Sequence, residues 1–339
     1  MRDINKVLAE MRKQHGDAII RTGNEIPALT VFPTKIPMID YRMGGGLLMG
    51  RTTIVAGVEN SGKTSFAYKC AANFQEVEIP VFYVDTEKQY DPERAKLFGV
   101  DNDNIYVIQG ELTAENVYET VRDLLKSINS QKDTRAFIVV DSIANMVSEA
   151  LFDKVASTQF GGSARMINQS LQIWQILLQS NQAILAINQF RDNIGSMGEK
   201  EMMPGGMGQK YTAATIIWLR AGLTLKEGDV PIGQEIKITI KKSKTSSPKS
   251  TAVLKFYYER GFEIIENLVE TALEMEVLNQ RGGGYYALPS GEEVKGKDKF
   301  IKKLQEDTEF MSKLWDLVYS KMNFPLWNGE NVSHETIDE

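Results

Sequence analysis

The sequence has very little of the residues that cross-link a chain or form metal sites on their own. Cys70 is the single cysteine among 339 residues, so no disulfide can form within the chain, and His15 and His334 are the two histidines. One thiol and two imidazoles do not supply the ligands of a structural zinc site. This composition favours a reducing compartment, and we expect a cytoplasmic location.

Long apolar runs and excess positive charge are also missing. No segment approaches the roughly 18 consecutive apolar residues that a membrane-spanning helix needs, and residues 1–18 are too charged for a signal peptide. Lysine and arginine number 39 against 45 aspartate and glutamate residues, a formal net charge of −6. The chain therefore cannot coat nucleic acid through bulk positive charge, and any polyanion site must be local.

What remains is the composition of a folded protein. Hydrophobic residues make up 42% and charged residues 25% of the chain, close to globular averages, which argues against disorder and fibrous architecture. The length leaves room for one large domain and a smaller one.

Short apolar runs alternate with helical patterns in the first two thirds of the chain. The predicted strands of this part are 53–56, 81–84, 105–108, 136–140 and 183–187. Near-continuous apolar strands separated by helices predict an α/β fold, with a mostly parallel twisted sheet covered by helices on both faces. Further strands at 215–219, 236–240 and 253–257 have short connections, which favours an antiparallel extension.

The ends of the chain differ from this central part. Residues 1–25 read as a helix followed by a short strand, which we interpret as an arm, and residues 26–265 form the core. Residues 266–325 mix helical and strand patterns, including a lysine-rich helix around 299–304, and predict a small α+β domain. Residues 326–339 form an acidic tail.

The strongest chemical signal is a glycine-rich loop directly after the first core strand. It matches the pattern G-x-x-x-x-G-K-[ST] and consists of Gly57, Val58, Glu59, Asn60, Ser61, Gly62, Lys63 and Thr64. In such a loop backbone N–H groups surround phosphates, the lysine reaches the β- and γ-phosphates, and the threonine hydroxyl binds Mg²⁺. An ordinary glycine turn with a surface lysine is the alternative, which the flanking strand and helix disfavour.

Carboxylates follow two of the later strands. Asp141 directly follows the run 136–140. A magnesium-binding aspartate of a nucleotide site stands at this position of a strand. Capping of the next helix is the alternative. The triplet Asp85, Thr86 and Glu87 follows the strand 81–84, and one of its carboxylates could polarise a water that attacks the γ-phosphate, although helix capping again competes. Both sites depend on the phosphate loop for their interpretation.

The order of further motifs is typical of one family. They are YVDTE at 83–87, YDP at 90–92, FGV at 98–100, VDS at 140–142, ARM at 164–166, INQFR at 187–191 and GG at 205–206. With these motifs, residues 5–321 closely resemble the bacterial and phage RecA recombinases, with a RecA-like ATPase core. Residues 34–38 and 202–211 are more similar to the UvsX branch of the phage enzymes, which indicates a bacterial cell or a phage-infected host.

The resemblance implies roles for residues around ATP and Mg²⁺. It makes Glu87 the general base, Thr64 and Asp141 the magnesium residues, and Gln189 the sensor of the γ-phosphate, where the residues alone would suggest a polar strand end. Ser65, Asp91 and Arg94 would extend the nucleotide site, with Arg94 in place of a tyrosine beside adenine. Lys242 and Lys244 would reach the ATP of a neighbouring subunit, whereas the run alone reads as a solvated basic turn.

The resemblance also implies two DNA-binding loops, 151–160 and 191–209, where the residues alone permit solvated surface loops. The second contains five glycines and four methionines. Cations would lie near phosphates and apolar side chains between bases. The implied DNA-binding residues are Arg165, Arg191, Ile194, Met197, Gly205, Gly206 and Lys210.

The function that the resemblance implies is DNA-dependent ATP hydrolysis coupled to homologous pairing and strand exchange. The partners would be single-stranded DNA, homologous duplex DNA, further copies in a helical filament, and a single-strand-binding protein and loader. A hexameric RecA-fold helicase is one alternative, and closed rings would favour it. A noncatalytic recombination mediator is another, against which the complete set of Lys63, Thr64, Glu87 and Asp141 counts.

Overall fold

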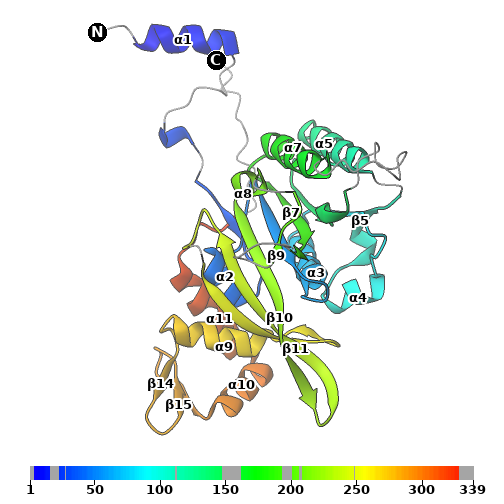
Figure 1. Ribbon diagram of the computed structural model, residues 1–339. Helices are drawn as coiled ribbons and strands as arrows, with labels where there is room; N and C mark the ends of the chain where they lie inside the picture. The colour runs from blue at the N-terminus through cyan, green and yellow to red at the C-terminus, as the bar shows by residue number, and fades with distance from the viewer. Residues whose placement is uncertain are drawn as a thin grey trace.

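A nine-stranded sheet forms the centre of the protein (Figure 1). The structure is a computed structural model that describes residues 4–15, 23–26, 28–110, 113–146, 162–192, 201–205, 208–247 and 249–327. The strands follow the spatial order β13 (Gly261–Phe262), β12 (Thr251–Tyr257), β11 (Val230–Lys242), β10 (Thr215–Glu227), β3 (Arg51–Gly57), β7 (Gln182–Gln189), β6 (Ala136–Asp141), β4 (Val81–Asp85) and β5 (Ile105–Ile108).

The pairing directions confirm the predicted mostly parallel sheet with an antiparallel extension. Strands from β10 to β5 pair in parallel, and β10 to β13 pair antiparallel. Within the parallel part, Gly57 is the register partner of Gln189, and Asp85 is the partner of Asp141. The residues after these strands therefore meet at one edge of the sheet, where ligands of open α/β sheets bind.

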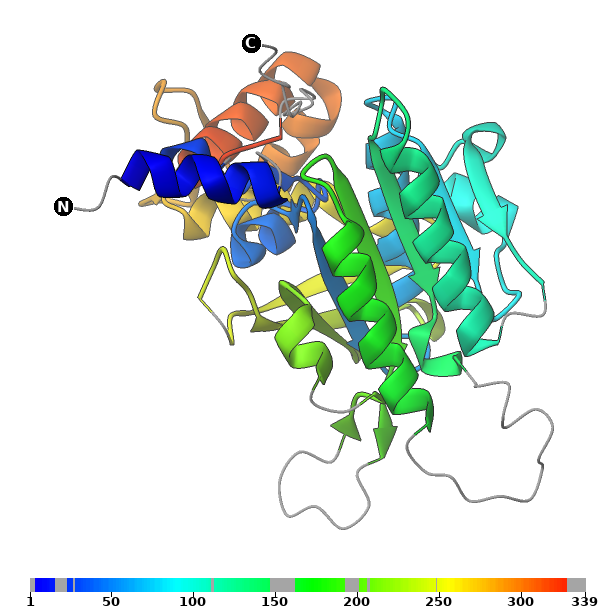
Figure 2. The same ribbon diagram turned by 90° about the horizontal axis from the view of Figure 1, so that it is seen from above.

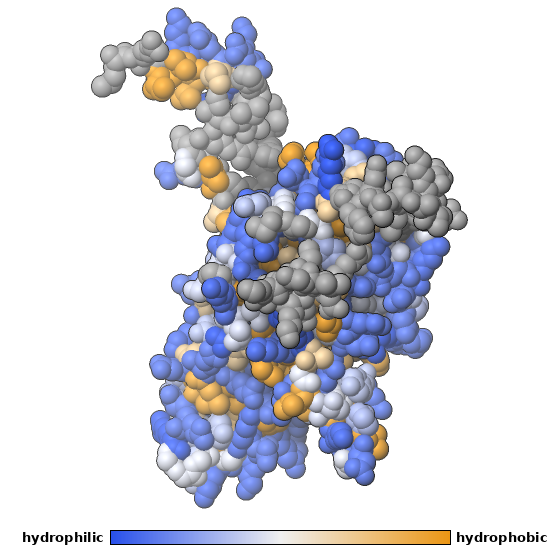
Figure 3. Space-filling model, viewed as in Figure 1, coloured by the Kyte–Doolittle hydropathy of each residue, from blue (hydrophilic) through white to orange (hydrophobic). Residues whose placement is uncertain are grey.

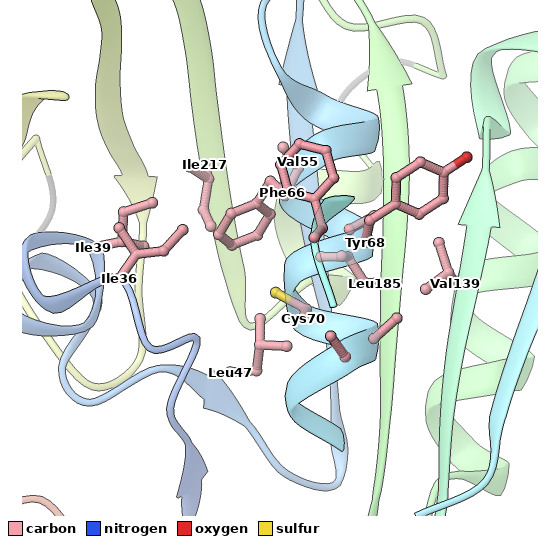
Figure 4. Close-up of a cluster of buried hydrophobic side chains, with 14 of the residues drawn as sticks. Ile36, Ile39, Leu47, Val55, Phe66, Tyr68, Cys70, Val139, Leu185 and Ile217 are labelled. Atoms are coloured by element: carbon pink, nitrogen blue, oxygen red, sulfur yellow. The ribbon is translucent and has the colours of Figure 1, made fainter. Parts of the chain in front are cut away.

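Helices cover both faces of the sheet. One face packs against α3 (Lys63–Gln75) and α2 (Pro37–Met43), with α4 (Pro92–Leu97) at its edge. Figure 4 shows Phe66 and Cys70 of α3 among the buried residues of this layer, so the single thiol is part of the core. The other face packs against α5 (Ala114–Asn129) and α7 (Gly162–Leu177), which lie side by side in Figure 2.

The hairpin of β10 and β11 is longer than the sequence predicts. Each strand has 13 residues, whereas the apolar pattern indicates 215–219 and 236–240. The added ladder leaves the core, and Leu223 and Val230 are 72% and 64% exposed near its tip. The prediction missed these residues because it followed buried apolar runs, and cross-strand hydrogen bonds extend a hairpin without them.

The C-terminal segment has its own hydrophobic cluster. It comprises α9 (Ile264–Glu274), β14 (Asn279–Arg281), β15 (Tyr285–Ala287), β16 (Glu293–Lys295), α10 (Lys297–Glu306) and α11 (Thr308–Met322). The hydroxyl of Tyr319 on α11 donates to Asp40 Oδ2 of α2 at 2.6 Å, which ties this segment to the core. Lys297 and Lys302 of the lysine-rich helix pair with glutamates, so part of its positive charge is neutralised.

The N-terminal helix forms as expected. Helix α1 (Ile4–His15) exposes Ile4, Val7 and Met11, and Figure 3 shows hydrophobic surface on it at the top of the view. The strand expected at 18–20 lies outside the described residues. Throughout the residues that the structure describes, the helices are too short or too polar to cross a bilayer.

Candidate nucleotide site

The loop between β3 and α3 turns where its glycines are. Gly62 has a φ of +87°, a left-handed conformation that favours glycine. A side chain at Gly57 would lie 2.4 Å from the carbonyl oxygen of Leu219 on β10 and equally close to Ser61 Oγ. Both positions therefore exclude larger residues, and the loop leads straight into the N-terminus of the 13-residue α3, where backbone N–H groups bind anions.

Lys63 lies inside this loop and is 8% exposed. Its ammonium donates a hydrogen bond of 2.6 Å to the carbonyl oxygen of Val58, which also accepts from Ser61 Oγ at 2.7 Å. Burial lowers the pKa of Lys63, while the negative charges of Asp141 and Glu87 raise it. The ammonium of Lys63 thus lies inside the loop. When a nucleotide binds, phosphate oxygens would replace the carbonyl oxygen of Val58 as its partners.

Asp141 binds the first turn of α3. Its Oδ2 accepts hydrogen bonds from Thr64 Oγ1 at 3.0 Å and from the hydroxyl of Tyr83 at 2.6 Å. Burial raises the pKa of Asp141 to about 6, although these two bonds lower it. Asp141 does not cap the following 3₁₀ turn Ile143–Asn145, whose N-cap is Ser142.

The pair of Thr64 and Asp141 fits a magnesium ion. A hydroxyl and a carboxylate are hard oxygen donors, which Mg²⁺ prefers together with phosphate oxygens and water. A dication beside Asp141 would stabilise its charged form against burial. Among the described residues no group of three histidine, cysteine, aspartate or glutamate side chains could hold a metal alone, so a nucleotide would have to complete this site.

Glu87 lies at the same edge and has two side-chain partners. Ser142 Oγ donates to Glu87 Oε1 at 2.6 Å, and Gln189 Nε2 donates to the same oxygen at 2.7 Å. Glu87 does not cap a helix, because α4 begins later and has Asp91 as its N-cap. The structure therefore brings together β4, β6 and β7 at one carboxylate.

Asp85, by contrast, accepts hydrogen bonds from the turn that contains Glu87. It is 2% exposed and accepts hydrogen bonds from the backbone N–H groups of Glu87 and Tyr90 and from Gln109 Nε2. A carboxylate with these partners orients the loop and does not face a ligand.

Arg94 and Asp91 lie beside the phosphate loop. Arg94 Nη2 donates to Ser65 Oγ at 3.3 Å, and its guanidinium lies 5.9 Å from the ring centre of Phe98. Asp91 is exposed, and its side chain accepts the N–H of Arg94 as the N-cap of α4. Ser65 and Arg94 are thus in contact next to Thr64. Asp91 caps the N-terminus of α4.

Lys242 is not a solvated turn residue. Its ammonium donates to the carbonyl oxygens of Lys210 and Ala213 at 2.6 Å each and of Tyr211 at 3.3 Å, at the C-terminal end of α8 (Gly208–Thr212). Burial, with the charge of Lys244 beside it, lowers the pKa of Lys242. Lys244 is exposed. Lys242 lies away from the phosphate loop of its own subunit, because it pairs with Ile216 on β10, whereas Gly57 pairs with Leu219 further along the same strand.

Part of the predicted DNA-binding set can be placed. Arg165 is exposed on α7, Lys210 is exposed on α8, and Arg191 begins the short strand β8 (Arg191–Asp192), which pairs with β9 (Glu201–Met202). Gly205 is buried, and its carbonyl oxygen accepts from Asn168 Nδ2 at 2.7 Å. The residues outside the described part are Ile194, Met197, Gly206 and the whole loop 151–160.

The sequence analysis missed a link between the second loop and the sensor strand. Asn188, next to Gln189, donates through Nδ2 to Gln209 Oε1 at 2.8 Å and to the carbonyl oxygen of Pro204 at 3.1 Å. Both side chains are fully buried. The analysis also missed Tyr83, which donates to Asp141, and Ser142, which donates to Glu87. The one available signal was their position beside a motif carboxylate, which does not reveal which way a side chain points.

These features define a class of protein: an α/β fold of the nucleotide-binding type, with a phosphate loop and two carboxylates, Asp141 and Glu87, at one edge of a parallel sheet. Residues 2–263 match the RecA N-terminal domain family, and the chain belongs to that family. It is similar to "Protein RecA" of Saccharopolyspora erythraea, with 29% identity over 98% of this chain and 94% of the relative. It is also similar to "Protein RecA" of Acinetobacter baylyi, with 28% identity over 99% and 96% of the two chains.

Proposed function

We propose that this protein is an ATP-dependent DNA recombinase that assembles as a helical filament on single-stranded DNA and catalyses homologous pairing and strand exchange. The observation that carries the proposal is the meeting of Lys63, Asp141, Glu87 and Gln189 at one edge of the sheet, with hydrogen bonds from Gln189 and Ser142 to Glu87. The similarity to RecA proteins over nearly the whole chain supports the DNA substrate and the assembly.

In this proposal the phosphate loop binds ATP through backbone N–H groups and Lys63. Thr64 and Asp141 hold Mg²⁺, which neutralises phosphate charge. Ser142 and the turn fixed by Asp85 orient Glu87, which accepts the proton of the attacking water. Gln189 exchanges its bond to Glu87 for one to the γ-phosphate, and Arg94 stacks on the base.

The same proposal assigns the remaining residues. Lys242 and Lys244 act on the nucleotide of the adjacent subunit. The segment 1–25 packs as an arm on an adjacent subunit. Arg165, Arg191 and Lys210 contact DNA phosphates near the two loops. Asn188 and Gln209 then transmit the state of the sensor strand to the second loop, because they join β7 to the segment that ends this loop.

Electron microscopy with single-stranded DNA and a nonhydrolysable ATP analogue tests the assembly. We expect helical filaments that require both ligands. A strand-exchange assay with homologous and heterologous duplexes, with ATP and without it, tests the reaction. Closed rings without strand exchange would instead support a helicase, and filaments without ATP turnover would support a structural mediator.

A further inference from the structure

Trp218 lies between the two strands that carry the sensor and the interface lysines. It is on β10, and its register partners across the parallel sheet are Ala56 on β3 and, beyond it, Asn188 on β7. Ala56 is small, so the indole can extend over β3 toward β7. Trp218 is 3% exposed, and within the described part of the chain its indole N–H has no hydrogen-bond partner. Ring contacts therefore fix its position.

The first of these contacts reaches the sensor strand. The ring of Phe190 lies 4.8 Å from that of Trp218 with an interplanar angle of 69°, an edge-to-face arrangement. Phe190 directly follows Gln189, and its N–H donates to the carbonyl oxygen of Gly57 at 3.1 Å. A shift of Gln189 toward a γ-phosphate would therefore move a ring that packs on Trp218.

The second contact reaches the strand of the interface lysines. Lys241 Nζ lies 3.8 Å from the centre of the Trp218 ring, a close cation–π contact. Arg220 lies over the same ring at 4.7 Å and over that of Phe190 at 5.2 Å. Two cations on a buried indole limit its movement.

A β-bulge at Lys241 sets the direction of Lys242. Ile217 pairs with Ile240, but the next pair is Ile216 with Lys242, so Lys241 is the inserted residue. Regular alternation would turn Lys241 and Lys242 to opposite faces, whereas both here contact groups of the face that carries Trp218 and α8. The position of Lys241 on the indole thus determines where the Lys242 ammonium lies.

We propose that Phe190, Trp218 and Lys241 are positioning residues that couple the nucleotide of one subunit to that of the next. This inference rests on the proposed function, in which Gln189 contacts the nucleotide of its own subunit and Lys242 that of a neighbour. Binding at the first site displaces Phe190, the displacement passes through the indole to Lys241, and the bulge carries it to Lys242. The coupling makes successive hydrolysis sites cooperative.

The matched variants are Lys241→Met, which keeps the aliphatic stem and removes the cation, and Lys237→Met, which makes the same change at an exposed position of the same strand. The assay is DNA-stimulated ATP hydrolysis against ATP concentration. We expect Lys241→Met to lower the Hill coefficient toward 1 and to raise half-saturating ATP by about 5- to 30-fold, as the loss of a partly desolvated cation–π contact allows. Lys237→Met should behave as the wild type. Lys241→Arg, whose guanidinium can stack on the indole, should restore cooperativity.

A second readout does not depend on hydrolysis. With 5-fluorotryptophan incorporated, the resonance of Trp218 is assigned by its loss in Trp218→Phe, and a nonhydrolysable ATP analogue should shift it in the wild type. The shift should disappear in Gln189→Ala, in which bound nucleotide is confirmed separately. Unchanged cooperativity in Lys241→Met, or an unchanged Trp218 resonance on nucleotide binding, would overturn the coupling while the recombinase stands. A wild type without DNA-stimulated hydrolysis would overturn the proposed function and the coupling with it.

Discussion

The side-chain amide of Gln189 donates a hydrogen bond of 2.7 Å to the carboxylate of Glu87, from β7 to the loop after β4. The strand order here is β3, β7, β6, β4, so the bond passes across the end of β6. It lies at the edge of the sheet at which the phosphate loop begins, after β3. The amide holds the carboxylate as long as no stronger acceptor is near. In the proposed mechanism the γ-phosphate is such an acceptor, and its arrival frees Glu87 to bind water.

Glu87→Gln tests the role of this carboxylate. The amide keeps the shape of the side chain and can accept from Ser142, but it cannot take a proton from water. We expect ATP to bind with nearly unchanged affinity and filaments on DNA to persist, while DNA-stimulated hydrolysis falls about 100-fold or more. Phosphate release and filament lifetime measure the two effects. Undiminished turnover would exclude Glu87 as the base, and Asp85 could not replace it in its present conformation, since three donors occupy it.

Lys63→Ala removes the cation at the centre of the phosphate loop. We expect ATP binding to fall by at least about 100-fold, because phosphate charge is left without its buried partner. DNA binding that depends on ATP should be lost with it, while circular dichroism should show a retained fold, since Lys63 contacts only the loop carbonyl of Val58 among the hydrogen-bond partners that the structure shows. Lys69→Ala, on the same helix, is the control. A folded Lys63→Ala protein with wild-type nucleotide affinity would contradict the assignment of the loop.

A mixing experiment tests whether the active site is shared between subunits. Lys242→Ala combined with Lys244→Ala should leave ATP binding to the isolated subunit nearly intact and should abolish DNA-stimulated hydrolysis. Mixed filaments of this protein and Glu87→Gln should regain part of the activity, because one subunit supplies the base and its neighbour supplies the lysines. Co-assembly without any recovery would show that the lysines act elsewhere.

Lys242 needs a control for its local contacts. Its replacement also removes the donor from three carbonyls at the C-terminal end of α8, whereas Lys244 is exposed and has no such role in the described structure. Lys244→Ala alone should therefore reduce hydrolysis without a change in thermal stability. An equal loss of stability in both single variants would mean that the effect is structural.

Asp40 should make stability depend on pH. Burial raises the pKa of Asp40 to about 7, against hydrogen bonds from Tyr319 and Thr34 that lower it. The folded protein therefore holds a proton that the unfolded chain loses near pH 4, so the free energy of unfolding falls as the pH rises from about 4 to 7, by on the order of 4 kcal/mol. Asp40→Asn should flatten this dependence and raise the melting temperature at pH 8 relative to the wild type.

Calorimetry of both proteins between pH 5 and 8 measures this difference. Asp141, whose pKa is also raised, contributes with the same sign in both, so the difference isolates Asp40. Tyr319→Phe is the matched control: it removes a bond that favours the charged form and should move the transition to higher pH. Parallel curves for the wild type and Asp40→Asn would show that the buried carboxyl does not titrate in this range.

The phosphate loop, the parallel strands and the order of the motifs could be predicted from the sequence, because each depends on residues that are neighbours in the chain. Pairings across the sheet could not. That Ser142 donates to Glu87 and Asn188 to Gln209 follows from the strand order β7, β6, β4 and from the path of the second loop. The bulge at Lys241 is a register shift of a hairpin, and alternation of residue types gives no sign of it. The length of β10 and β11 was missed for the related reason that exposed ladder residues lack a hydrophobic signal.

The cap that Lys242 places on α8 has a consequence for growth. If the lysine acts on a neighbour's nucleotide, it must first leave three carbonyl partners, and it does so only in a subunit that has a neighbour on that side. The two ends of a filament then differ. At one end, Lys242 of the terminal subunit stays bonded to the carbonyls at the C-terminal end of α8. At the other end, the nucleotide of the terminal subunit lacks the lysines of a neighbour. The two ends would bind and lose subunits at different rates, which gives the polymer a direction even before the polarity of DNA contributes.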